Sequence, residues 1–534
     1  MNRRRPVSLG TDVRPRGRRR RLSIAGAAIL ITVLTAVSTV MGLARDVVIA
    51  AVFGAGGELD GYFVALGLMN VALGLLAGAM SKAAVPVLSR QYAAEDGTRR
   101  SRRRSRTTMS VAISVTVVGL GVATLVMQLF AAEIVAVLAP GFGPAEAESA
   151  QQLTRIVLIA TVLIAGTNLL AAAAQSRRTF FWSAIQGVPF NLAMIVAAAV
   201  FGPEYGVTAL AWGFVVGSAA RLLVQLPPLR RIGLRLRPSL RLDDPDFRAM
   251  VRMIPPLLLG SAIGNVNTLV DRAVGSTVGD GVISSLSYAW RLVSLADTVL
   301  IASLLVALYP ALSTAADDTA ELRRLVDRGL SATVVVLVPI CVGTAVAAGP
   351  VVETVFQRGE FSADDASTTA TALLWYAPAV LALGWREVIV RASYALDDTR
   401  RPVAVAVVAM VVNVAGDLTL GIAYGIPGLA ASTSLSLVVA AVGNTWLLSR
   451  RHDAVAVGAL WGLLGRTTAS AAATLGAALG VAWLVRDLPA IAQVAAVGTV
   501  CLTVFAAAAL LQRGPEASVL RDATRLLRRP RARA

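Results

Sequence analysis

The chain has 534 residues, of which 56% are hydrophobic and only 15% are charged, and its mean hydropathy is +0.69. A water-soluble protein carries about 25% charged residues, so this composition excludes a soluble globular protein. The two cysteines, Cys341 and Cys501, both lie in apolar runs, and His452 is the only histidine. These counts argue against a disulfide scaffold, a zinc site or Ser/His/Asp catalysis, and we expect no enzyme.

Apolar runs long enough to cross a hydrocarbon core about 30 Å thick recur along the chain. They predict an all-α polytopic membrane protein with about fourteen transmembrane helices. In chain order the expected spans cover residues 23–53, 61–88, 107–130, 151–175, 181–201, 207–228, 254–275, 284–313, 330–356, 367–396, 403–423, 428–449, 460–485 and 489–511.

The formal net charge of +18 comes from basic blocks that flank alternate spans. This placement follows the positive-inside rule, and it predicts a multi-pass membrane protein with both termini in the cytoplasm. The blocks lack interleaved aromatic residues, so we expect them to contact membrane lipids and not nucleic acid.

A faint internal repeat predicts two related lobes around a central cavity. Arg177-Arg178, Asn191 and Tyr205-Gly206 are echoed about 220 residues later by Arg400-Arg401, Asn413 and Tyr424-Gly425. Such a parallel repeat is typical of transporters that alternate between inward and outward openings. The expected organisation is a basic N-terminal segment at 1–22, a first six-helix lobe at 23–228, a basic connector at 229–253, a second six-helix lobe at 254–449, two further helices within 450–511, and a basic cytoplasmic tail at 512–534.

Ionisable side chains inside spans each cost roughly 2.5 to 3.5 kcal/mol at the bilayer centre. Those in the first, second, seventh and eighth spans are expected to meet across the cavity. For Arg45 two interpretations stay open, an ion pair with Asp46 or Asp60 and an anion-binding guanidinium in the cavity. Adjacent helix residues point about 100° apart, so we expect Arg45 and Asp46 not to pair. Arg291 has no acidic residue one turn away, which favours phosphate binding by its planar fork.

A second cluster offers only oxygen ligands. Asn413 and Asp417 are spaced i, i+4 and share one helix face, while Asp271 and Thr433 add oxygens from other spans. Oxygen ligation suits a hard cation such as sodium, which would be the protein's only cofactor. The alternative is that these polar residues only join helices to one another.

Six short motifs carry a family resemblance. They are Gly42-Leu43-Ala44-Arg45-Asp46, Phe53-Gly54-Ala55-Gly56, Asp60-Gly61-Tyr62-Phe63-Val64-Ala65, Ala139-Pro140-Gly141-Phe142, Phe356-Gln357-Arg358-Gly359 and Tyr394-Ala395-Leu396-Asp397-Asp398-Thr399. In this order they resemble the MurJ (MviN) lipid II flippase family. The resemblance implies fourteen helices in two lobes. It also implies that the protein moves a polyprenyl-diphosphate-linked peptidoglycan precursor from the inner to the outer leaflet of the bacterial cytoplasmic membrane.

The resemblance also implies roles for individual residues. Arg45, Asp46, Asp60 and Arg291 match cavity positions of the family. A sodium site is matched by Asp271, Asn413, Asp417, Thr433 and the backbone carbonyl of Leu429. The family arginines of the first and second spans are here Thr39 and Leu73, and two acidic positions are Gly78 and Ser294. We expect Lys82 to compensate partly for the missing cations as a substrate-binding residue.

These departures keep several functions open. The leading hypothesis is a flippase for the lipid-linked peptidoglycan precursor, with cell-wall synthesis enzymes as expected partners. The alternatives are a flippase for another lipid-linked glycan, a cation-coupled drug exporter, and an envelope scaffold that has lost transport.

Overall fold

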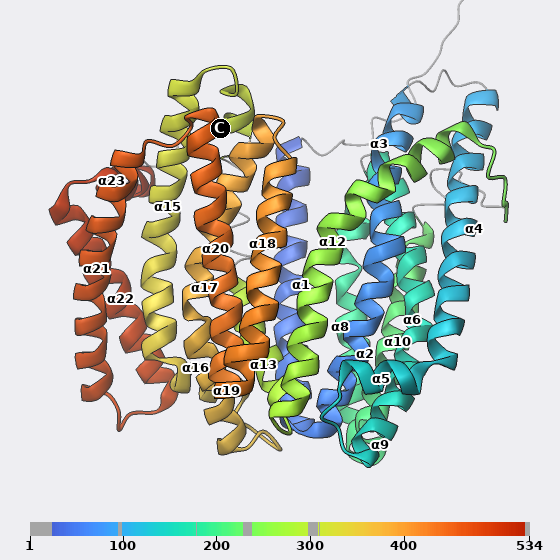
Figure 1. Cartoon of the computed structure of the whole chain (residues 1–534), viewed down its shortest axis with the longest axis horizontal. Coiled ribbons are helices and arrows are strands. Elements are labelled where there is room, and N and C mark those ends of the chain that lie inside the picture. Colours follow the sequence, from blue (N-terminus) through green and yellow to red (C-terminus); the bar gives the residue numbers. More distant parts are fainter. Residues whose placement is uncertain are drawn as a thin grey trace, which may run out of the picture.

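The computed structural model describes residues 24–93, 99–177, 179–227, 238–296, 308 and 310–528. Helices make up nearly all of these residues, and no strand occurs among them (Figure 1). Eleven of the described helices are long and apolar enough to cross a membrane, judged by length and composition. An all-α polytopic membrane protein is therefore confirmed. The expected basic segment at 1–22 lies outside the described residues, as do positions 228–237 of the connector region and 529–534 of the tail.

The first half of the chain, residues 24–227, forms one group of helices. In order these are α1 (Ile24–Phe53), α2 (Gly57–Ala72), the π-helical turn η1 (Leu73–Gly78), α3 (Ala79–Ala93), α4 (Arg99–Leu129), α5 (Ala131–Leu138), α6 (Pro144–Ser176), α7 (Phe181–Ile185), α8 (Gly187–Val196), the π-helical turn η2 (Ala197–Phe201), α9 (Gly202–Tyr205) and α10 (Val207–Val224).

The second half begins after the basic connector. It comprises α12 (Pro245–Val278), α13 (Val282–Ala296), α15 (Thr319–Val346), α16 (Ala348–Phe356), α17 (Ala363–Ala395), α18 (Arg400–Gly416), the π-helical turn η4 (Asp417–Gly421), α19 (Ile422–Tyr424), α20 (Ile426–His452), α21 (Val457–Leu484), α22 (Ala490–Gln512) and α23 (Pro515–Arg528).

The expected spans and the observed helices differ in two respects. The span expected at 330–356 is two helices, α15 and α16, and α15 begins at Thr319 because the Asp318 side chain caps it by accepting from the backbone N–H groups of Ala320 and Glu321. The first part of α15 is polar, so hydropathy places the start of the expected span later, at residue 330. The spans expected at 61–88 and 254–275 overlap α2 to α3 and α12, and the first part of the span expected at 284–313 overlaps α13; none of these helices is among the eleven. Positions 297–307 and 309 of the last span lie outside the described residues. The count of fourteen therefore stays a prediction.

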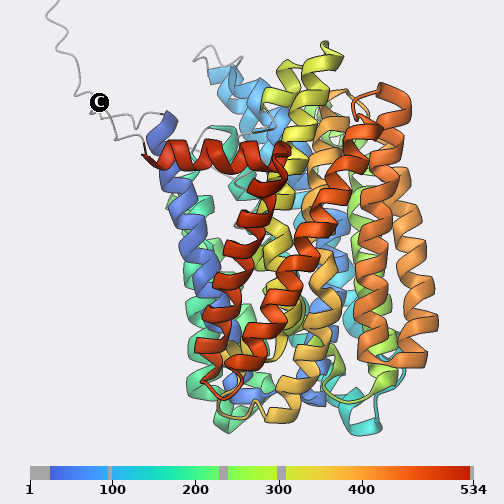
Figure 2. The ribbon, with the colours of Figure 1, turned by 90° about the vertical axis from the view of Figure 1, so that its left-hand side faces the viewer.

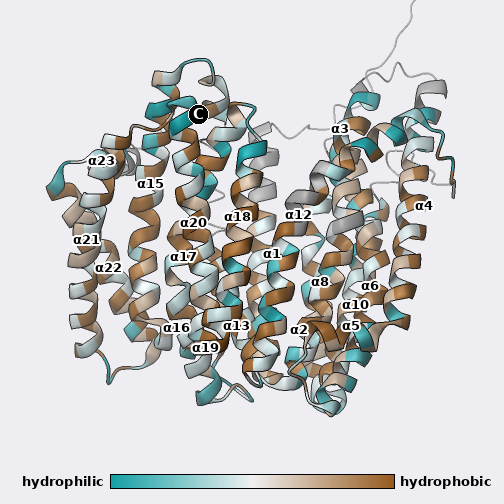
Figure 3. Cartoon of the chain, viewed as in Figure 1, coloured by the Kyte–Doolittle hydropathy of each residue, from teal (hydrophilic) through white to brown (hydrophobic). Residues whose placement is uncertain are grey.

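The long helices run side by side (Figure 1). In this view α1 and α12 lie in the middle, α2 to α10 lie on one side of them, and α15 to α23 lie on the other. The short helix α23 lies across one end of this bundle (Figure 2). Hydrophilic residues concentrate toward the ends of the helices, and the flanks are largely apolar (Figure 3). Large apolar side chains such as Trp212, Trp461 and Trp483 are exposed there, as expected for surfaces that face lipid.

The internal repeat is visible in the local structure. In both copies a helix passes through a π-helical turn, η2 or η4, and ends at a Tyr-Gly pair before the next long helix begins. Gly206 has φ 58° and ψ −152°, and Gly425 has φ 67° and ψ −134°. The two segments thus share a conformation as well as a motif. The arrangement of the halves as two moving lobes stays a prediction.

Candidate substrate and cation sites

A cationic pocket of about 370 Å³ lies between α1, α8, α10 and α13. Three arginines line it, namely Arg45 on α1, Arg221 on α10 and Arg291 on α13, together with uncharged polar residues that include Thr39 and Asn191. We call this the cationic pocket. Since α13 belongs to the second half of the chain, the pocket is built from both halves. This confirms that charges of the first and eighth expected spans meet.

Asp46 holds two of these arginines. Its carboxylate is 2.7 Å from Arg45 Nη2 and 2.7 Å from Arg291 Nε. The expectation that Arg45 and Asp46 do not pair is therefore wrong. Neighbouring Cβ atoms do point apart on a helix, but the flexible arginine stem is long enough to fold back along α1, and both Arg45 Nε and Nη2 donate to Asp46 Oδ1.

Two neighbours fix the position of these guanidinium groups. Arg45 Nη1 donates to Asn191 Oδ1 at 3.2 Å, and Asn191 Nδ2 donates to the carbonyl of Ser38 on α1. Arg291 lies against Gly42, where an added Cβ would be 2.5 Å from Arg291 Nη2. A glycine at position 42 therefore gives the arginine of the second half room to approach α1. This contact accounts for the spacing of Gly42, Arg45 and Asp46 in the first motif.

Asp60 is placed differently from the expectation. It is buried, and it accepts hydrogen bonds from the backbone N–H of Ser284 at 2.7 Å and from the Ser284 hydroxyl. Since α13 begins at Val282, the carboxylate caps the N-terminus of this helix from across the interface between the halves. No ion pair joins Asp60 to Arg45 among the described residues. Asp60 is therefore a contact between the halves and does not line the cationic pocket.

The structure places Lys82 outside the cationic pocket, contrary to expectation, and places Arg221 in it. Lys82 has an exposed side chain on α3 and does not line the cationic pocket, so the structure does not bring it to the other predicted substrate residues. Arg221, which the sequence reasoning missed, does line it. The available signal was its position about two turns inside the span expected at 207–228.

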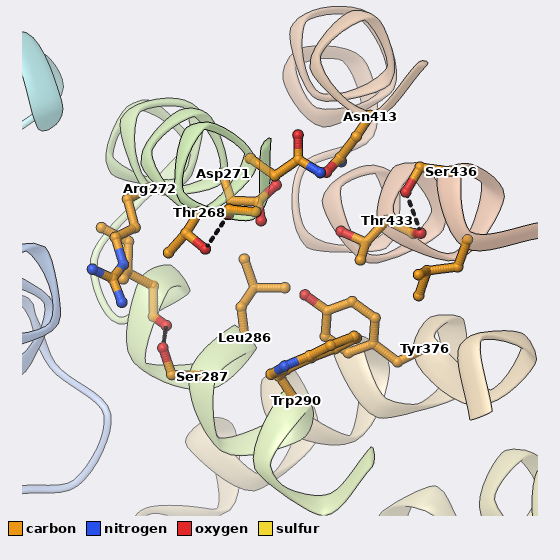
Figure 4. A pocket seen from close by; sticks show the side chains of 14 residues that line it. Thr268, Asp271, Arg272, Leu286, Ser287, Trp290, Tyr376, Asn413, Thr433 and Ser436 are labelled. Carbon is orange, nitrogen blue, oxygen red and sulfur yellow. Dashed lines mark hydrogen bonds between the residues drawn. The ribbon is translucent and has the colours of Figure 1, made fainter. Parts of the chain in front are cut away.

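The predicted cation ligands gather around a second cavity, of about 290 Å³, in the second half of the chain. Asp271, Asn413 and Thr433 line it (Figure 4). Asn413 Nδ2 lies 3.2 Å from both carboxylate oxygens of Asp417, which confirms that the two residues share a face. Asp417 also accepts from the Ser432 hydroxyl, and it begins the π-helical turn η4. The Leu429 carbonyl accepts from the hydroxyls of Ser432 and Thr433.

The donor set of this cavity fits a hard monovalent cation. The Asp271 carboxyl group faces Asn413 and Asp417, and its buried Oδ1 has no hydrogen-bond partner. Two carboxylates at one point repel each other unless a proton or a cation lies between them. Within the described part of the chain, no group of three or more His, Cys, Asp or Glu residues is arranged to hold a metal ion. A site with two carboxylates and neutral oxygens suits sodium better than a transition metal.

The two sites resemble each other in position and oppose each other in charge. In the first half, Arg45 of α1 contacts Asn191 of α8. In the second half, Asp271 of α12 faces Asn413 of α18, the residue that the repeat matches to Asn191. The same location therefore carries a cationic group in one half and an anionic group in the other.

At the end of the bundle where α1 leads into α2, the two halves are locked together. The Glu360 N–H donates to the Ala51 carbonyl at 2.9 Å, and the Tyr288 hydroxyl donates to the Gly54 carbonyl at 3.4 Å. Gly281, with φ 74°, lies so close to Ala55 that an added Cβ would be 2.0 Å from its carbonyl oxygen. We call this region the closed end. It brings together the motifs around Phe53 and Phe356.

The helical bundle, with charged residues gathered at two sites between its helices, defines a polytopic membrane transporter fold. A solved structure titled as a lipid II flippase MurJ in an inward closed conformation matches with a TM-score of 0.76, at 21% identity, over 93% of this chain and all of that chain. An inward-facing multidrug resistance MATE family transporter of the MOP superfamily matches with a TM-score of 0.63 at 13% identity, over 80% of this chain and 98% of that one. At these identities the likeness shows the fold alone.

Sequence comparison identifies the family. The family model for the lipid II flippase MurJ matches residues 49–503. A probable lipid II flippase MurJ of Vibrio cholerae is 30% identical over 77% of this chain and 80% of its own length. The lipid II flippase MurJ of Burkholderia cenocepacia is 28% identical over 80% and 83%, and a probable one of Synechocystis is 27% identical over 94% and 97%. The chain belongs to the MurJ family of lipid II flippases, which are transporters and not enzymes.

Proposed function

We propose that this protein moves lipid II, the polyprenyl-diphosphate-linked peptidoglycan precursor, from the inner to the outer leaflet of the bacterial cytoplasmic membrane by alternating access. Family membership supports this proposal. The observation that carries it is the convergence of Arg45 and Arg291, from the two halves of the chain, on one pocket within the bundle. Guanidinium groups bind phosphate oxygens through paired N–H donors.

The mechanism follows from where the pocket and the closed end lie. The diphosphate would bind the cationic pocket while the closed end blocks passage to the outer face. The polyprenyl tail would stay in lipid, since burying it in a polar cavity has no benefit. Breaking the contacts of Gly54, Gly281 and Glu360 would then open the other side. The orientation that this requires has both termini in the cytoplasm, and cell-wall synthesis enzymes that consume lipid II would be partners on the outer face.

Asp46 has a mechanistic role in this proposal. Without substrate it neutralises part of the charge on Arg45 and Arg291 and keeps the two halves in contact. An arriving diphosphate would compete with Asp46 for both guanidinium groups. Substrate binding would thereby loosen an attachment between the halves, as a ligand shifts a conformational equilibrium through its different affinity for the two states.

The test is complementation of a bacterial strain whose own lipid II flippase can be depleted. We expect the wild type to restore growth, and Arg45→Ala and Arg291→Ala to fail at equal membrane abundance. Arg486→Ala is the matched control, because Arg486 is an exposed arginine in the loop between α21 and α22. Restored growth by the Arg45→Ala, Arg291→Ala double variant would contradict the proposal, and failure of the wild type would favour an envelope scaffold or another substrate.

We also propose that sodium binds between Asp271, Asn413, Asp417, Thr433 and the Leu429 carbonyl. The unpartnered Asp271 Oδ1 and the facing carboxylates support this assignment. A bound cation would connect α12, α18 and α20. Sodium should therefore change the distance distribution between spin labels on the two halves, relative to potassium at equal ionic strength, and Asp417→Asn should abolish the change. Identical wild-type distance distributions in the two salts would contradict the sodium site and indicate that these residues only join helices to one another.

A further inference from the structure

Arg221 is the one arginine of the cationic pocket that no acidic residue neutralises among the described residues. It lies near the C-terminal end of α10, and its guanidinium carbon is 5.0 Å from the centre of the Phe190 ring. The Arg45 guanidinium carbon is 5.8 Å from the same ring. Phe190 is itself held edge-on against Phe214, with ring centroids 5.2 Å apart. A fixed aromatic side chain therefore positions both arginines.

The charges of the pocket do not balance. Among the described residues, Arg45, Arg221 and Arg291 contribute three positive charges, and Asp46 supplies the one negative charge bound to them. The other described residues that line the pocket are uncharged. An excess of two positive charges inside a membrane bundle is costly unless an anion occupies the site. A diphosphate esterified at both ends carries two negative charges, so it matches the excess.

We propose that Arg221 is a third diphosphate-binding residue and that it gives the pocket its preference for a diphosphate over a monophosphate. This deepens the proposed function and rests on it for the identity of the lipid. Without Arg221 the pocket would keep two arginines and one carboxylate, an excess of one positive charge that a single phosphate esterified on both sides, with its one negative charge, could satisfy.

Thr39 and Arg221 line the same pocket from different helices, α1 and α10. An arginine on either helix would therefore face the same bound anion. Position 39 is thus the place where an added arginine should replace the charge of Arg221.

The test measures binding of two probes by the full chain in lipid nanodiscs. The diphosphate probe is a polyprenyl diphosphate that bears a sugar, so that it is esterified at both ends and carries two negative charges. The monophosphate probe is a polyprenyl phosphate of equal chain length that bears the same sugar, and its phosphodiester carries one negative charge. We expect the wild type to prefer the diphosphate, and Arg221→Gln to lose about ten- to a hundredfold in diphosphate affinity, the range of a charge-assisted contact. Its monophosphate affinity should change little. Arg221→Lys should retain part of the preference, and Thr39→Arg in the Arg221→Gln background should restore it. Arg486→Gln is the control and should bind as the wild type does.

Several outcomes would overturn the inference. One is equal diphosphate affinity of the wild type and Arg221→Gln. Another is a parallel loss of both probes that Thr39→Arg does not rescue, which would indicate that Arg221 only stabilises α10 against α8. A wild type that binds neither probe would overturn it too. A wild type that shows the expected pattern of binding but moves no lipid II in liposomes would support the role of Arg221 and refute the proposed function.

Discussion

Replacement of Gly281 by alanine should open the closed end. Gly281 has φ 74°, and an added Cβ would lie 2.0 Å from the Ala55 carbonyl oxygen. Real contacts of this kind are longer than 3.0 Å, so the loop after α1 and the start of α13 must move apart by about 1 Å. That shift weakens the neighbouring hydrogen bonds of Asp60 to Ser284 and of Tyr288 to Gly54.

The size of the effect follows from these contacts. A hydrogen bond contributes about 0.5 to 1.5 kcal/mol, and one to a charged group about 1.5 to 3 kcal/mol. Loss of the Tyr288 bond and part of the Asp60 bond therefore disfavours the closed end by about 2 kcal/mol, which is a shift of roughly thirtyfold in the ratio of closed to open molecules. The strain of alanine at positive φ adds to this, about 1 to 2 kcal/mol.

The assay is a distance distribution between spin labels at Glu204 and Asp487, in a background where Cys341 and Cys501 are replaced by alanine. Glu204 lies in α9 and Asp487 in the loop between α21 and α22, and both are exposed. Gly206→Ala is the matched control, because Gly206 has a similar φ of 58° and its added Cβ would have only the end of Glu58 within 4 Å, at 3.8 Å. Longer distances in Gly281→Ala alone are expected. Equal distributions in Gly281→Ala and Gly206→Ala would refute the reasoning.

Three further predictions concern stability and topology. Asp60→Asn should lower the free energy of unfolding by about 0.5 to 1.5 kcal/mol, because an amide replaces the carboxyl group that caps α13, and an unchanged thermal midpoint would speak against the cap. Burial raises the pKa of the Asp398 carboxyl, but hydrogen bonds from His452 and Arg401 outweigh it and leave the pKa below its ordinary value. This interaction should stabilise the protein above the unfolded-state pKa of about 3.9. The stabilisation should be lost as the pH falls through the lower folded-state pKa. Asp398→Asn should therefore lower the thermal midpoint at pH 7, and its midpoint should match that of the wild type under strongly acidic conditions. A constant difference at all pH values would contradict it. Reporter fusions after Arg104 and after Arg451 should read cytosolic and one within Ser276 to Gly281 extracytosolic, and a cytosolic signal from the last would disprove the orientation.

Much of the fold could be predicted from the sequence because lipid imposes strong limits on it. A membrane span must be helical and apolar over about 20 residues, so hydropathy located the helices. The polar first part of α15, from Thr319 to Arg328, was not predicted as helix, because hydropathy detects only the apolar part of a helix. The repeat was detectable because Tyr-Gly pairs at Gly206 and Gly425 adopt one turn conformation in both halves.

The candidate sites were predictable only in part. The i, i+4 spacing was enough to place Asn413 beside Asp417, because both lie on one helix. Contacts between distant helices could not be predicted from the sequence, because they depend on how the helices pack. The cap of α13 by Asp60 and the approach of Arg291 to Gly42 both join residues from different halves of the chain. Arg221 was missed for the same reason, because its place in the pocket depends on the packing of α10 and α8, where it contacts Phe190.

Translocation by purified protein tests the central claim most directly. The measurement is the accessibility of fluorescently labelled lipid II to a membrane-impermeant quencher, in liposomes that contain the wild type or the Arg45→Ala, Arg291→Ala double variant. The account predicts that the wild type exchanges lipid II between leaflets, and that the double variant and protein-free liposomes do not. Equal accessibility with the wild type and with protein-free liposomes, while a different lipid-linked headgroup crosses, would contradict it.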